Sequence, residues 1–323
     1  MEDMFLGIDT SCYTTSLAVV TRNRKLLVDK RRILKVPLGE KGLQQAMAVF
    51  QHLQNLPPML EELVEEVSFQ DIKLIAASAL PRSVKGSYMP VFTVSEGQAR
   101  ILASAMEVTF KAFSHQEGHL RAGLWSSGKE LNERFLAVHL SGGTSELLIV
   151  EFNKGKGFNI KLMGGTTDLH AGQFVDRIGV RLGLKFPAGK ELEKLASHAS
   201  GTSLKLSSSV RGYDFSFSGP ESQAARLLEK GEEPSHIARS VEHCIAKTIE
   251  KVARKAVEET GVKDILLVGG VASNTYIRVK LEERLSHRAV NAKLFFAHPR
   301  FSTDNAVGVA LLGKDYFQRE RQQ

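Results

Sequence analysis

One strand–turn–strand pattern occurs twice in the sequence, and this repetition constrains the fold more than any other feature. The first copy is Phe5–Val20 and the second is Phe135–Val150, 130 residues further along the chain. Each copy places a turn of small and hydroxyl-bearing residues between two apolar strands, and strands alternating with helices follow. We interpret the repetition as an internal duplication, although strands of α/β proteins also resemble one another by chance. A duplication predicts an α/β chain with two lobes and a cleft between them.

The other elements follow from apolar periodicity and from turn residues. A helix is expected over Gly42–Val67, broken once at Pro57 and Pro58, because proline removes a backbone donor. The polar stretch Ser126–Arg134 is the expected linker between the halves. Further helices are expected over Glu96–Val108, Asp168–Leu184, Ser235–Glu259 and at the C-terminus. Further strands are expected over Lys73–Ser78, Thr109–Ser114, Ile160–Gly165, Asp264–Gly270 and Lys293–His298.

The composition excludes several classes of protein. Hydrophobic residues make up 42% of the chain and charged residues 24%, which excludes a mainly disordered, collagen-like or coiled-coil protein. The two cysteines, Cys12 and Cys244, are too few for a disulfide framework or an all-cysteine zinc site. Neither has a histidine placed to make it a nucleophile, so both are interpreted as structural. No apolar run approaches about 18 residues and no signal peptide is recognisable, so a reducing, cytoplasmic setting is expected.

Two features of the sequence are compatible with anionic ligands. The net charge of +7 permits a polyanionic partner, although many basic proteins bind no nucleic acid. Three turns of small and hydroxyl-bearing residues each follow a strand, and their backbone amides could approach a phosphate. These turns are Asp9–Ser16, Ser141–Ser145 and Gly269–Asn274. Any single turn is better explained as a tight hairpin without a ligand, but the three together favour a nucleotide or another phosphorylated ligand.

Two histidines have the spacing of a metal-binding pair. His115 and His119 are four residues apart, so on a helix both imidazoles lie on one face and could reach one metal ion. Glu117 lies between them on another face, which differs from the H-E-x-x-H motif of zinc proteases. A third ligand is required, and Asp304 is a candidate. Asp304 could equally be a helix N-cap, a role that its neighbours could also fill.

Other polar residues lie near the start of the helix expected after residue 168. Asp168 and Asp176 could position a ribose or a metal-bound phosphate, or could stabilise the helix through its dipole. The turn Phe186–Gly189 could place backbone against a ligand. Asp214–Gly219 alternates aromatic with hydroxyl-bearing residues, which is typical of an exposed strand edge.

The order of these motifs resembles that of the TsaD family, whose members were once called glycoprotease or Gcp. The resemblance covers about residues 5 to 315 and rests on motifs that occur in the family's order. They lie at Gly7–Ser16 (GIDTSCYTTS), His115–His119 (HQEGH), Ser141–Ser145 (SGGTS), Asp168–Arg177 (DLHAGQFVDR), Phe186–Gly189 (FPAG), Phe215–Gly219 (FSFSG), Gly269–Asn274 (GGVASN) and Thr303–Ala306 (TDNA).

The resemblance implies a fold and a domain division. The fold is an α/β, actin-like ATPase (ASKHA) fold, built from two duplicated RNase H-like lobes with a central cleft. The N-terminal lobe is expected over residues 1–128, with the C-terminal helix at residues 306–323 packing back on it. The C-terminal lobe is expected over residues 129–305.

The resemblance also implies an activity and a site. The family transfers a threonylcarbamoyl group from threonylcarbamoyl-adenylate to N6 of the adenosine beside the tRNA anticodon, an acyltransferase reaction. By motif, one divalent metal ion, iron or zinc, would be held by His115, His119 and Asp304. The adenylate, or an ATP-type nucleotide, would contact His139, Leu140, Ser141, Gly142, Gly143, Asp176, Gly189 and Asn274. No catalytic side chain is assigned, and the implied partners are tRNA and TsaB-like and TsaE-like proteins, without a membrane.

The sequence departs from the family motifs at several acidic positions. Tyr13 and Thr14 replace an Asp-Glu pair in the first motif, and Thr144 replaces the histidine of S-G-G-H-T. Leu169 and Gln173 replace acids in the fourth motif. These changes favour a divergent paralogue, which leaves open a carbamoyl-type transfer to another acceptor or a non-catalytic, partner-binding scaffold. A metalloprotease is not favoured, because no general base follows the first histidine as in H-E-x-x-H.

Overall fold

The computed structural model describes residues 2–37, 42–128, 131–153, 157–200 and 204–322. The chain forms two compact units. The first comprises Met1–Ser126, Phe152–Phe158 and Thr303–Gln323, and the second comprises Ser127–Glu151 and Asn159–Ser302. Residues 129–130 of the expected linker lie outside the described residues. No helix formed by the described residues is long and apolar enough to cross a bilayer.

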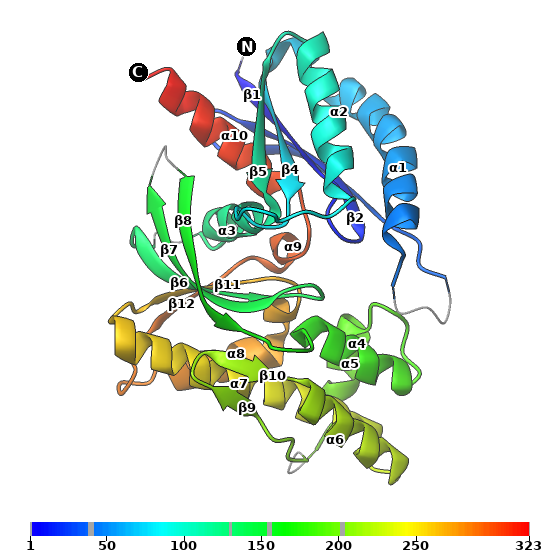
Figure 1. The fold of residues 1–323 in the computed structure, drawn as a ribbon, viewed down its shortest axis with the longest axis vertical. Coiled ribbons are helices and arrows are strands. Elements are labelled where there is room, and N and C mark those ends of the chain that lie inside the picture. Colours follow the sequence, from blue (N-terminus) through cyan, green and yellow to red (C-terminus); the bar gives the residue numbers. More distant parts are fainter. Residues whose placement is uncertain (1, 38–41, 129–130, 154–156, 201–203, 323) are drawn as a thin grey trace. The chain divides into compact units, whose positions relative to one another are not determined.

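The first unit contains a five-stranded sheet in the order β3-β2-β1-β4-β5 (Figure 1). Its strands are β1 (Met4–Asp9), β2 (Thr14–Thr21), β3 (Leu26–Ile33), β4 (Ile72–Leu80) and β5 (Thr109–Ser114). The strands β1, β2 and β3 form antiparallel pairs, whereas β1, β4 and β5 run parallel. Because parallel strands end at the same edge, Asp9, Leu80 and Ser114 come to one edge of this sheet. Ligand sites of open α/β sheets lie beyond such an edge.

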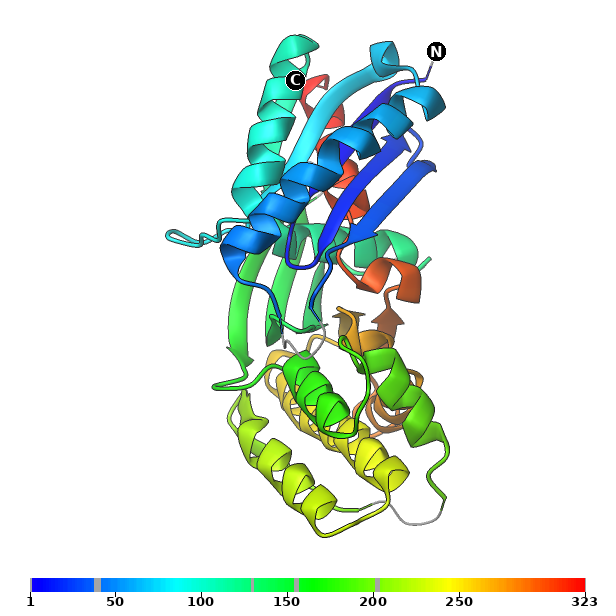
Figure 2. The ribbon, with the colours of Figure 1, turned by 90° about the vertical axis from the view of Figure 1, so that its right-hand side faces the viewer.

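Helices cover both faces of this sheet. The helices α1 (Gln45–Glu66) and α2 (Phe92–Ala105) share an apolar core with one face. The helix α10 (Val307–Glu320) packs on the other side of the strands, next to α3 (His115–Ser126) (Figure 2). The contact between α10 and α3 is made by backbone, because a Cβ at Gly308 would lie 1.9 Å from the carbonyl oxygen of Gly118. A glycine at position 308 is therefore required for this packing.

The helix α1 differs from the sequence-based expectation. Pro57 and Pro58 lie inside the helix, which continues through them without the expected break. Proline in a helix interior costs roughly 3 kcal/mol or more. Leu56, Met59 and Leu63 are buried on either side of the prolines, and each buried aliphatic side chain contributes about 1.5–3 kcal/mol. Packing on the sheet therefore outweighs the local effect of the prolines, and the expected break is wrong.

The sheet of the second unit repeats the topology of the first. Its order is β12-β11-β6-β7-β8, which is the order of the first sheet read from the opposite edge. Its strands are β6 (Arg134–Leu140), β7 (Ser145–Asn153), β8 (Gly157–Gly165), β11 (Asp264–Val268) and β12 (Lys293–Phe296). The register also repeats, since Phe5 pairs with Val20 and Phe135 pairs with Val150. The predicted duplication, with its offset of 130 residues, is confirmed.

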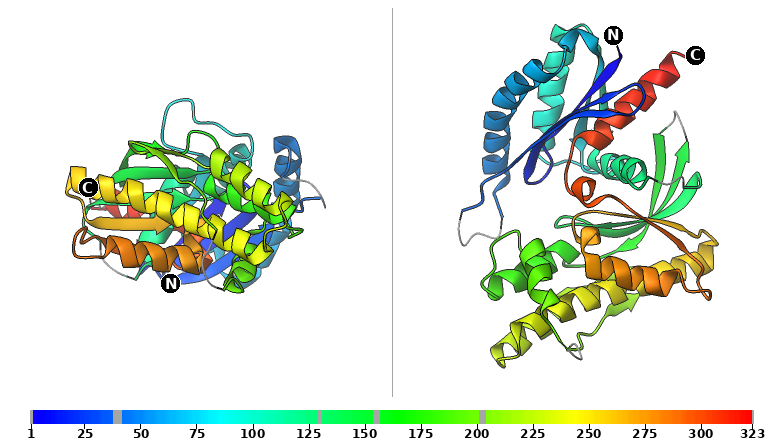
Figure 3. Two further views of the ribbon diagram at one scale, coloured as in Figure 1. Left: turned by 90° about the horizontal axis from the view of Figure 1, so that it is seen from below. Right: turned by 180° about the vertical axis from the view of Figure 1, so that it is seen from behind.

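The helix α7 (Pro234–Thr260) is the long yellow helix of Figure 3. It contributes many buried side chains to the apolar core of the second unit. The other elements are α4 (Ala171–Arg181), β9 (Ser209–Arg211), β10 (Asp214–Ser216), α5 (Gly189–Ser197), α6 (Ser218–Glu229), α8 (Thr275–Leu285) and α9 (Pro299–Ser302), with short 3₁₀ helices at Phe69–Asp71 and Val271–Ser273. The expected exposed strand edge at Asp214–Gly219 is only partly correct. Phe215 and Phe217 are buried, and Phe217 stacks on Phe174 of α4. The aromatic residues of the segment Asp214–Gly219 therefore belong to the core.

Candidate functional site

The start of α3 is fixed by a capping box. Ser114, the last residue of β5, accepts a hydrogen bond at Oγ from the N–H of Glu117 (3.2 Å), and its own N–H donates to Glu117 Oε2 (2.9 Å). This reciprocal pair satisfies two of the backbone donors that a helix start leaves open. Ser83 Oγ also donates to Glu117, at 2.6 Å. The glutamate between the two histidines therefore fixes where the helix begins.

The helix start places three ligand atoms together in the first unit. Nε2 of His115 and Nε2 of His119 are 2.9 Å apart, and each lies 3.3 Å from Oδ1 of Asp304. In a tetrahedral zinc site, bonds of about 2.0–2.1 Å separate ligand atoms by about 3.3 Å. The three residues predicted as metal ligands thus converge as a divalent ion requires, and imidazole nitrogen with carboxylate oxygen suits zinc or iron.

The electrostatics of this cluster favour a cation. Burial lowers the pKa of His115, but the carboxylates of Asp9 and Asp304 outweigh burial and raise that pKa to about 10. Burial, together with the charge on His115, lowers the pKa of His119. Although burial alone would raise the pKa of Asp304, its contacts with both histidines hold it well below its usual range. His115 therefore carries a proton at neutral pH between the carboxylates of Asp9 and Asp304, and a divalent cation would supply positive charge in place of that proton.

Two residues next to this cluster were not predicted as part of it. The sulfur of Cys12, which was expected to be structural, lies within 4.8 Å of ligand atoms of His115 and Asp304. Asp9 Oδ2 lies 3.2 Å from Nδ1 of His115. Both residues belong to the turn Asp9–Ser16, so their position after the first strand was the available signal.

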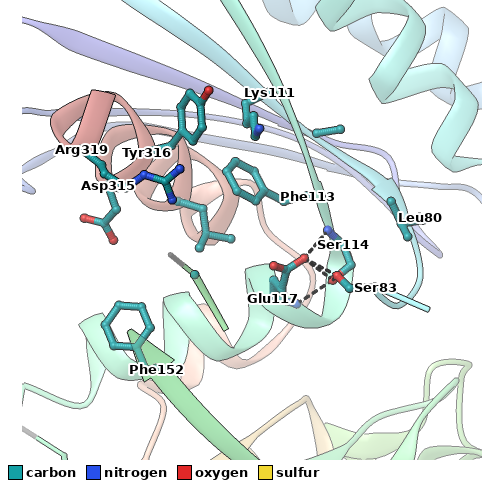
Figure 4. A pocket seen from close by; sticks show the side chains of 13 residues that line it. Leu80, Ser83, Lys111, Phe113, Ser114, Glu117, Phe152, Asp315, Tyr316 and Arg319 are labelled. Carbon is teal, nitrogen blue, oxygen red and sulfur yellow. Dashed lines mark hydrogen bonds between the residues drawn. The ribbon is translucent and has the colours of Figure 1, made fainter. Parts of the chain in front are cut away.

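A cavity of about 310 Å³ in the first unit lies on the Glu117 side of α3 (Figure 4). Its lining combines aromatic with charged side chains, among them Phe113, Tyr316, Lys111 and Arg319. Lys111 Nζ lies 4.2 Å from the centre of the Tyr316 ring. His115, His119 and Asp304 do not contribute to the lining, so the cavity is separate from their cluster.

The turn after β6 is closed by its own hydrogen bonds. Ser141 N–H donates to the carbonyl of Thr144 (2.7 Å), and the N–H of Thr144 donates to Ser141 Oγ (3.0 Å). Gly142 and Gly143 are exposed at the tip of the turn. The carbonyl of Ser141 also accepts from the N–H of Gly172 in α4, at 3.0 Å. The turn is therefore held rigidly, with its two glycines accessible to a ligand.

The side chains that precede this turn are not accessible. His139 and Leu140, the last residues of β6, are 2% and 0% exposed. Gly269, after the parallel strand β11, has φ of +96°, and a Cβ there would lie 2.2 Å from the carbonyl oxygen of Leu140. The glycine-rich turns after β6 and β11 therefore approach each other, and only backbone atoms of His139 and Leu140 are available to a ligand at this point.

Asn274 has structural partners for both ends of its amide. Its Oδ1 caps α8 by accepting from the N–H of Ile277 (2.9 Å), and its Nδ2 donates to Glu242 (2.6 Å). Glu242 also contacts Arg239 at 2.6 Å. Burial raises the pKa of Glu242 to about 7, although Asn274 and Arg239 both oppose the increase. Asn274 is thus positioned at the start of α8 by a buried carboxyl group.

The two aspartates of the α4 region have different partners. Asp176 Oδ1 accepts from the N–H of Ala188 (2.7 Å), which places it beside Gly189 at the start of α5. Asp168 accepts from the hydroxyl groups of Ser216 and Ser218, both at 2.5 Å. Although burial alone would raise the pKa of Asp168, these hydrogen bonds hold it well below its usual range. Asp168 therefore organises the FSFSG segment, whereas Asp176 and Gly189 are adjacent, as a shared ligand contact requires.

The structure accommodates three of the departures from the family motifs. Leu169 is buried in the apolar core of the second unit. Gln173 accepts from the N–H of His170 at 3.1 Å, a capping role that glutamine and glutamate share. Thr144 contributes to its turn through backbone atoms. These substitutions leave the local fold intact, so their consequences concern ligand contacts.

Known proteins resemble this chain in sequence. The profile of the TsaD family, described as tRNA N6-adenosine threonylcarbamoyltransferase, matches residues 40–311. A tRNA N6-adenosine threonylcarbamoyltransferase from Thermus thermophilus is 33% identical over 321 residues, which cover 97% of this chain and 93% of the relative. The corresponding protein from a second strain of Thermus thermophilus is also 33% identical and is covered to 92%.

Solved structures resemble the chain in fold. HypF from T. kodakarensis aligns with a TM-score of 0.62 and 14% identity, over 98% of this chain and 48% of HypF. The activator of the 2-hydroxyisocaproyl-CoA dehydratase from Clostridium difficile, with bound ADPNP, aligns with a TM-score of 0.56 and 15% identity, over 100% of this chain and 97% of the activator. With its duplicated five-stranded sheets, the protein has the actin-like ATPase fold. The chain belongs to the TsaD family of tRNA N6-adenosine threonylcarbamoyltransferases, which are acyltransferases.

Proposed function

We propose that this protein transfers a threonylcarbamoyl group from threonylcarbamoyl-adenylate to N6 of the adenosine beside the tRNA anticodon. The observation that carries the proposal is the convergence of His115, His119 and Asp304, whose ligand atoms lie 2.9–3.3 Å apart in a chain of this family. These three residues would hold one divalent ion, iron or zinc. The ion would supply Lewis acidity toward carbamoyl or phosphate oxygens.

The remaining residues would bind and orient the adenylate. The exposed turn at Gly142 and Gly143 offers backbone to a phosphate or sugar, and Asp176 with Gly189 forms a second contact. Asn274 and the backbone of His139–Ser141 complete the proposed nucleotide contacts. In the reaction, the N6 lone pair attacks the carbamoyl carbon, the bond from that carbon to the phosphate oxygen breaks, AMP leaves, and the amine releases a proton to solvent. Positioning and charge stabilisation account for such a transfer, so an obligatory acid–base side chain is not required.

The charge and one exposed helix face support the proposed partners. The net charge of +7 suits tRNA. We propose that the reaction takes place in the cytoplasm, together with its substrate. In α1, Met47, Phe50 and Leu53 form a row spaced three residues apart, and their exposed fractions are 50%, 55% and 44%. A solvent-facing apolar row of this kind supports a protein contact. We propose this row as the docking surface of a TsaB-like protein, with a TsaE-like protein completing the assembly.

A second candidate function rests on the altered first motif. Tyr13 and Thr14 stand where the family has an acidic pair, in the same turn as Cys12 beside the metal ligands. A change of charge at this position favours a paralogue that transfers a carbamoyl-type group to another acceptor, or a scaffold that binds nucleotide and a partner without turnover.

Reconstitution distinguishes these functions. The protein is incubated with threonylcarbamoyl-adenylate, cognate tRNA and TsaB-like and TsaE-like proteins, and modified nucleosides are quantified by mass spectrometry. Modification is expected with the wild type and with the control His198→Ala, which changes an exposed histidine, but not with His115→Ala. Unmodified tRNA, where an ordinary family member modifies it, would refute the proposed function. Turnover of the adenylate without tRNA modification would then support the paralogue, and no turnover would support the scaffold.

A further inference from the structure

We propose that Asp9 is a positioning residue that orients His115 toward the metal ion. This inference rests on the metal site proposed above. The orientation would be set by a hydrogen bond from Nδ1–H of His115 to the carboxylate of Asp9, which leaves Nε2 to bind the metal. Asp9 itself would not touch the ion, the nucleotide or the acceptor.

The topology of the first sheet brings the two residues together. Asp9 ends β1, and His115 follows β5 directly at the start of α3. Because β1, β4 and β5 are parallel neighbours, both residues lie at the carboxyl edge of the sheet. Oδ2 of Asp9 lies 3.2 Å from Nδ1 of His115, while Nε2 of the same ring faces His119 and Asp304. The two ring nitrogens thus have separate partners.

The carboxylate of Asp9 is fixed by other donors. Oδ1 accepts from the N–H of Ser11 at 2.6 Å and from the Ser11 hydroxyl, and Oδ2 accepts from Ser78 Oγ at 2.9 Å. Asp9 is only 1% exposed, so water does not compete for these oxygens. An acceptor held in this way selects the tautomer of His115 that carries its proton on Nδ1. When the ring gives up its second proton to bind a metal ion, the lone pair is therefore on Nε2, the nitrogen that faces His119 and Asp304.

The duplication shows that the sheet itself does not require a carboxylate here. Asp9 pairs with Ser16 in the first sheet, and the equivalent pair in the second sheet is His139 with Glu146. His139 is also buried, at 2% exposed, in the same register. The fold therefore accepts a different residue at this position. The carboxylate of Asp9 has a partner specific to the first unit, namely the metal-binding histidine.

This arrangement has a known chemical consequence. Histidine ligands that donate their second N–H to a carboxylate have a fixed ring orientation and a more basic ligating nitrogen, and loss of such a partner lowers metal affinity by about 10–100-fold. Asp9→Asn keeps the size of the side chain but removes its charge. It is expected to weaken zinc binding within that range.

The test measures zinc binding by the full chain without tRNA, adenylate or partner proteins. The zinc dissociation constant is determined by competition with a chromophoric chelator for wild type, Asp9→Asn, Ser78→Ala and the control Asp3→Asn, which changes a half-buried aspartate that pairs with Arg22. Asp9→Asn is expected to bind about 10–100-fold more weakly. Ser78→Ala, which loosens the Asp9 carboxylate without altering its charge, is expected to fall between Asp9→Asn and wild type. Asp3→Asn is expected to match wild type.

A spectroscopic measurement separates positioning from a general loss of structure. In the zinc-loaded wild type, ¹⁵N chemical shifts of the His115 ring are expected to show a proton on Nδ1 and zinc on Nε2. Wild-type affinity in Asp9→Asn, or zinc bound at Nδ1 of His115, would overturn the inference. No zinc binding by the wild type would overturn both the inference and the metal site. Zinc binding that depends on Asp9 without tRNA modification would leave the inference standing while the proposed function fails.

Discussion

The capping box at the start of α3 predicts that a residue that binds no metal controls metal affinity. Glu117→Ala removes the acceptor for the Ser114 N–H and for the Ser83 hydroxyl, while Glu117→Gln keeps a capping-box residue. Loss of the hydrogen bond from the Ser114 N–H costs about 1 kcal/mol, and loss of the bond from Ser83 costs about 1 kcal/mol more. The alanine variant is therefore expected to destabilise the first unit by about 2 kcal/mol. In the glutamine variant, the free energy of unfolding of the first unit is expected to fall by about half as much.

The same change should affect zinc binding. His115 is the first residue of α3, so fraying of the first turn separates its imidazole from His119. A local loss of about 2 kcal/mol corresponds to at most about a 30-fold weaker zinc affinity, because about 1.4 kcal/mol is a factor of ten. By the same conversion, Glu117→Gln is expected to weaken zinc affinity by at most about fivefold.

The chain offers a convenient signal for this assay. Its one tryptophan, Trp125, lies in α3 itself, and its Nε1 donates to the carbonyl of Arg24 at 3.2 Å. Urea unfolding followed by tryptophan fluorescence thus reports on the first unit, and chelator competition gives the zinc affinity. Equal stability and equal affinity in Glu117→Ala and the wild type would refute the role assigned to the capping box.

Two further changes test other parts of the structure. The pKa of Glu242, about 7 in the folded protein, lies above its ordinary value of 4.5, so the stability that its protonated form provides is present below about pH 4.5 and is lost as the pH rises through 7. Between pH 5 and pH 8, the free energy of unfolding of the wild type is expected to fall by up to about 3 kcal/mol relative to that of Glu242→Gln. Urea unfolding followed by circular dichroism measures both values, and a difference that does not change with pH would contradict the expectation. Phe50→Asp places a charge in the exposed row of α1 and is expected to weaken binding of a TsaB-like protein at least tenfold in a calorimetric titration, whereas Glu65→Gln on the same helix should not.

The strand pattern predicted the fold well because it depends on short-range periodicity. The repeat of Phe5–Val20 at Phe135–Val150 predicted the duplication, and the structure shows that the pairing register repeats as well. The error in α1 arose because Pro57 and Pro58 were judged from local propensity, whereas the apolar core decides the course of that helix. Local signals fail where tertiary burial is worth more than the propensity they describe.

The ligand cluster was predicted more completely than its surroundings. Helical spacing placed His115 and His119 on one face, and the family motif supplied Asp304. The role of Asp9 was not predicted, because its contact with His115 depends on the strand order β1-β4-β5, which the sequence does not state. The proximity of Cys12 was missed for the same reason.

In the second unit, sequence spacing did not reveal which polar groups already had partners. From the sequence, Asp168 was a candidate to position a ribose or a metal-bound phosphate. In the structure, its carboxylate already accepts hydrogen bonds from the hydroxyl groups of Ser216 and Ser218. These serines lie almost fifty residues along the chain, beyond the reach of any local pattern.

The proposed function depends on one divalent metal ion held in the first unit by His115, His119 and Asp304. Anomalous diffraction at the zinc edge, from crystals of the zinc-loaded full chain, tests this site. We expect one peak in this cluster, about 2.0–2.2 Å from Nε2 of each histidine and from an oxygen of Asp304. An anomalous peak elsewhere on the chain, with none at these three residues, would contradict it.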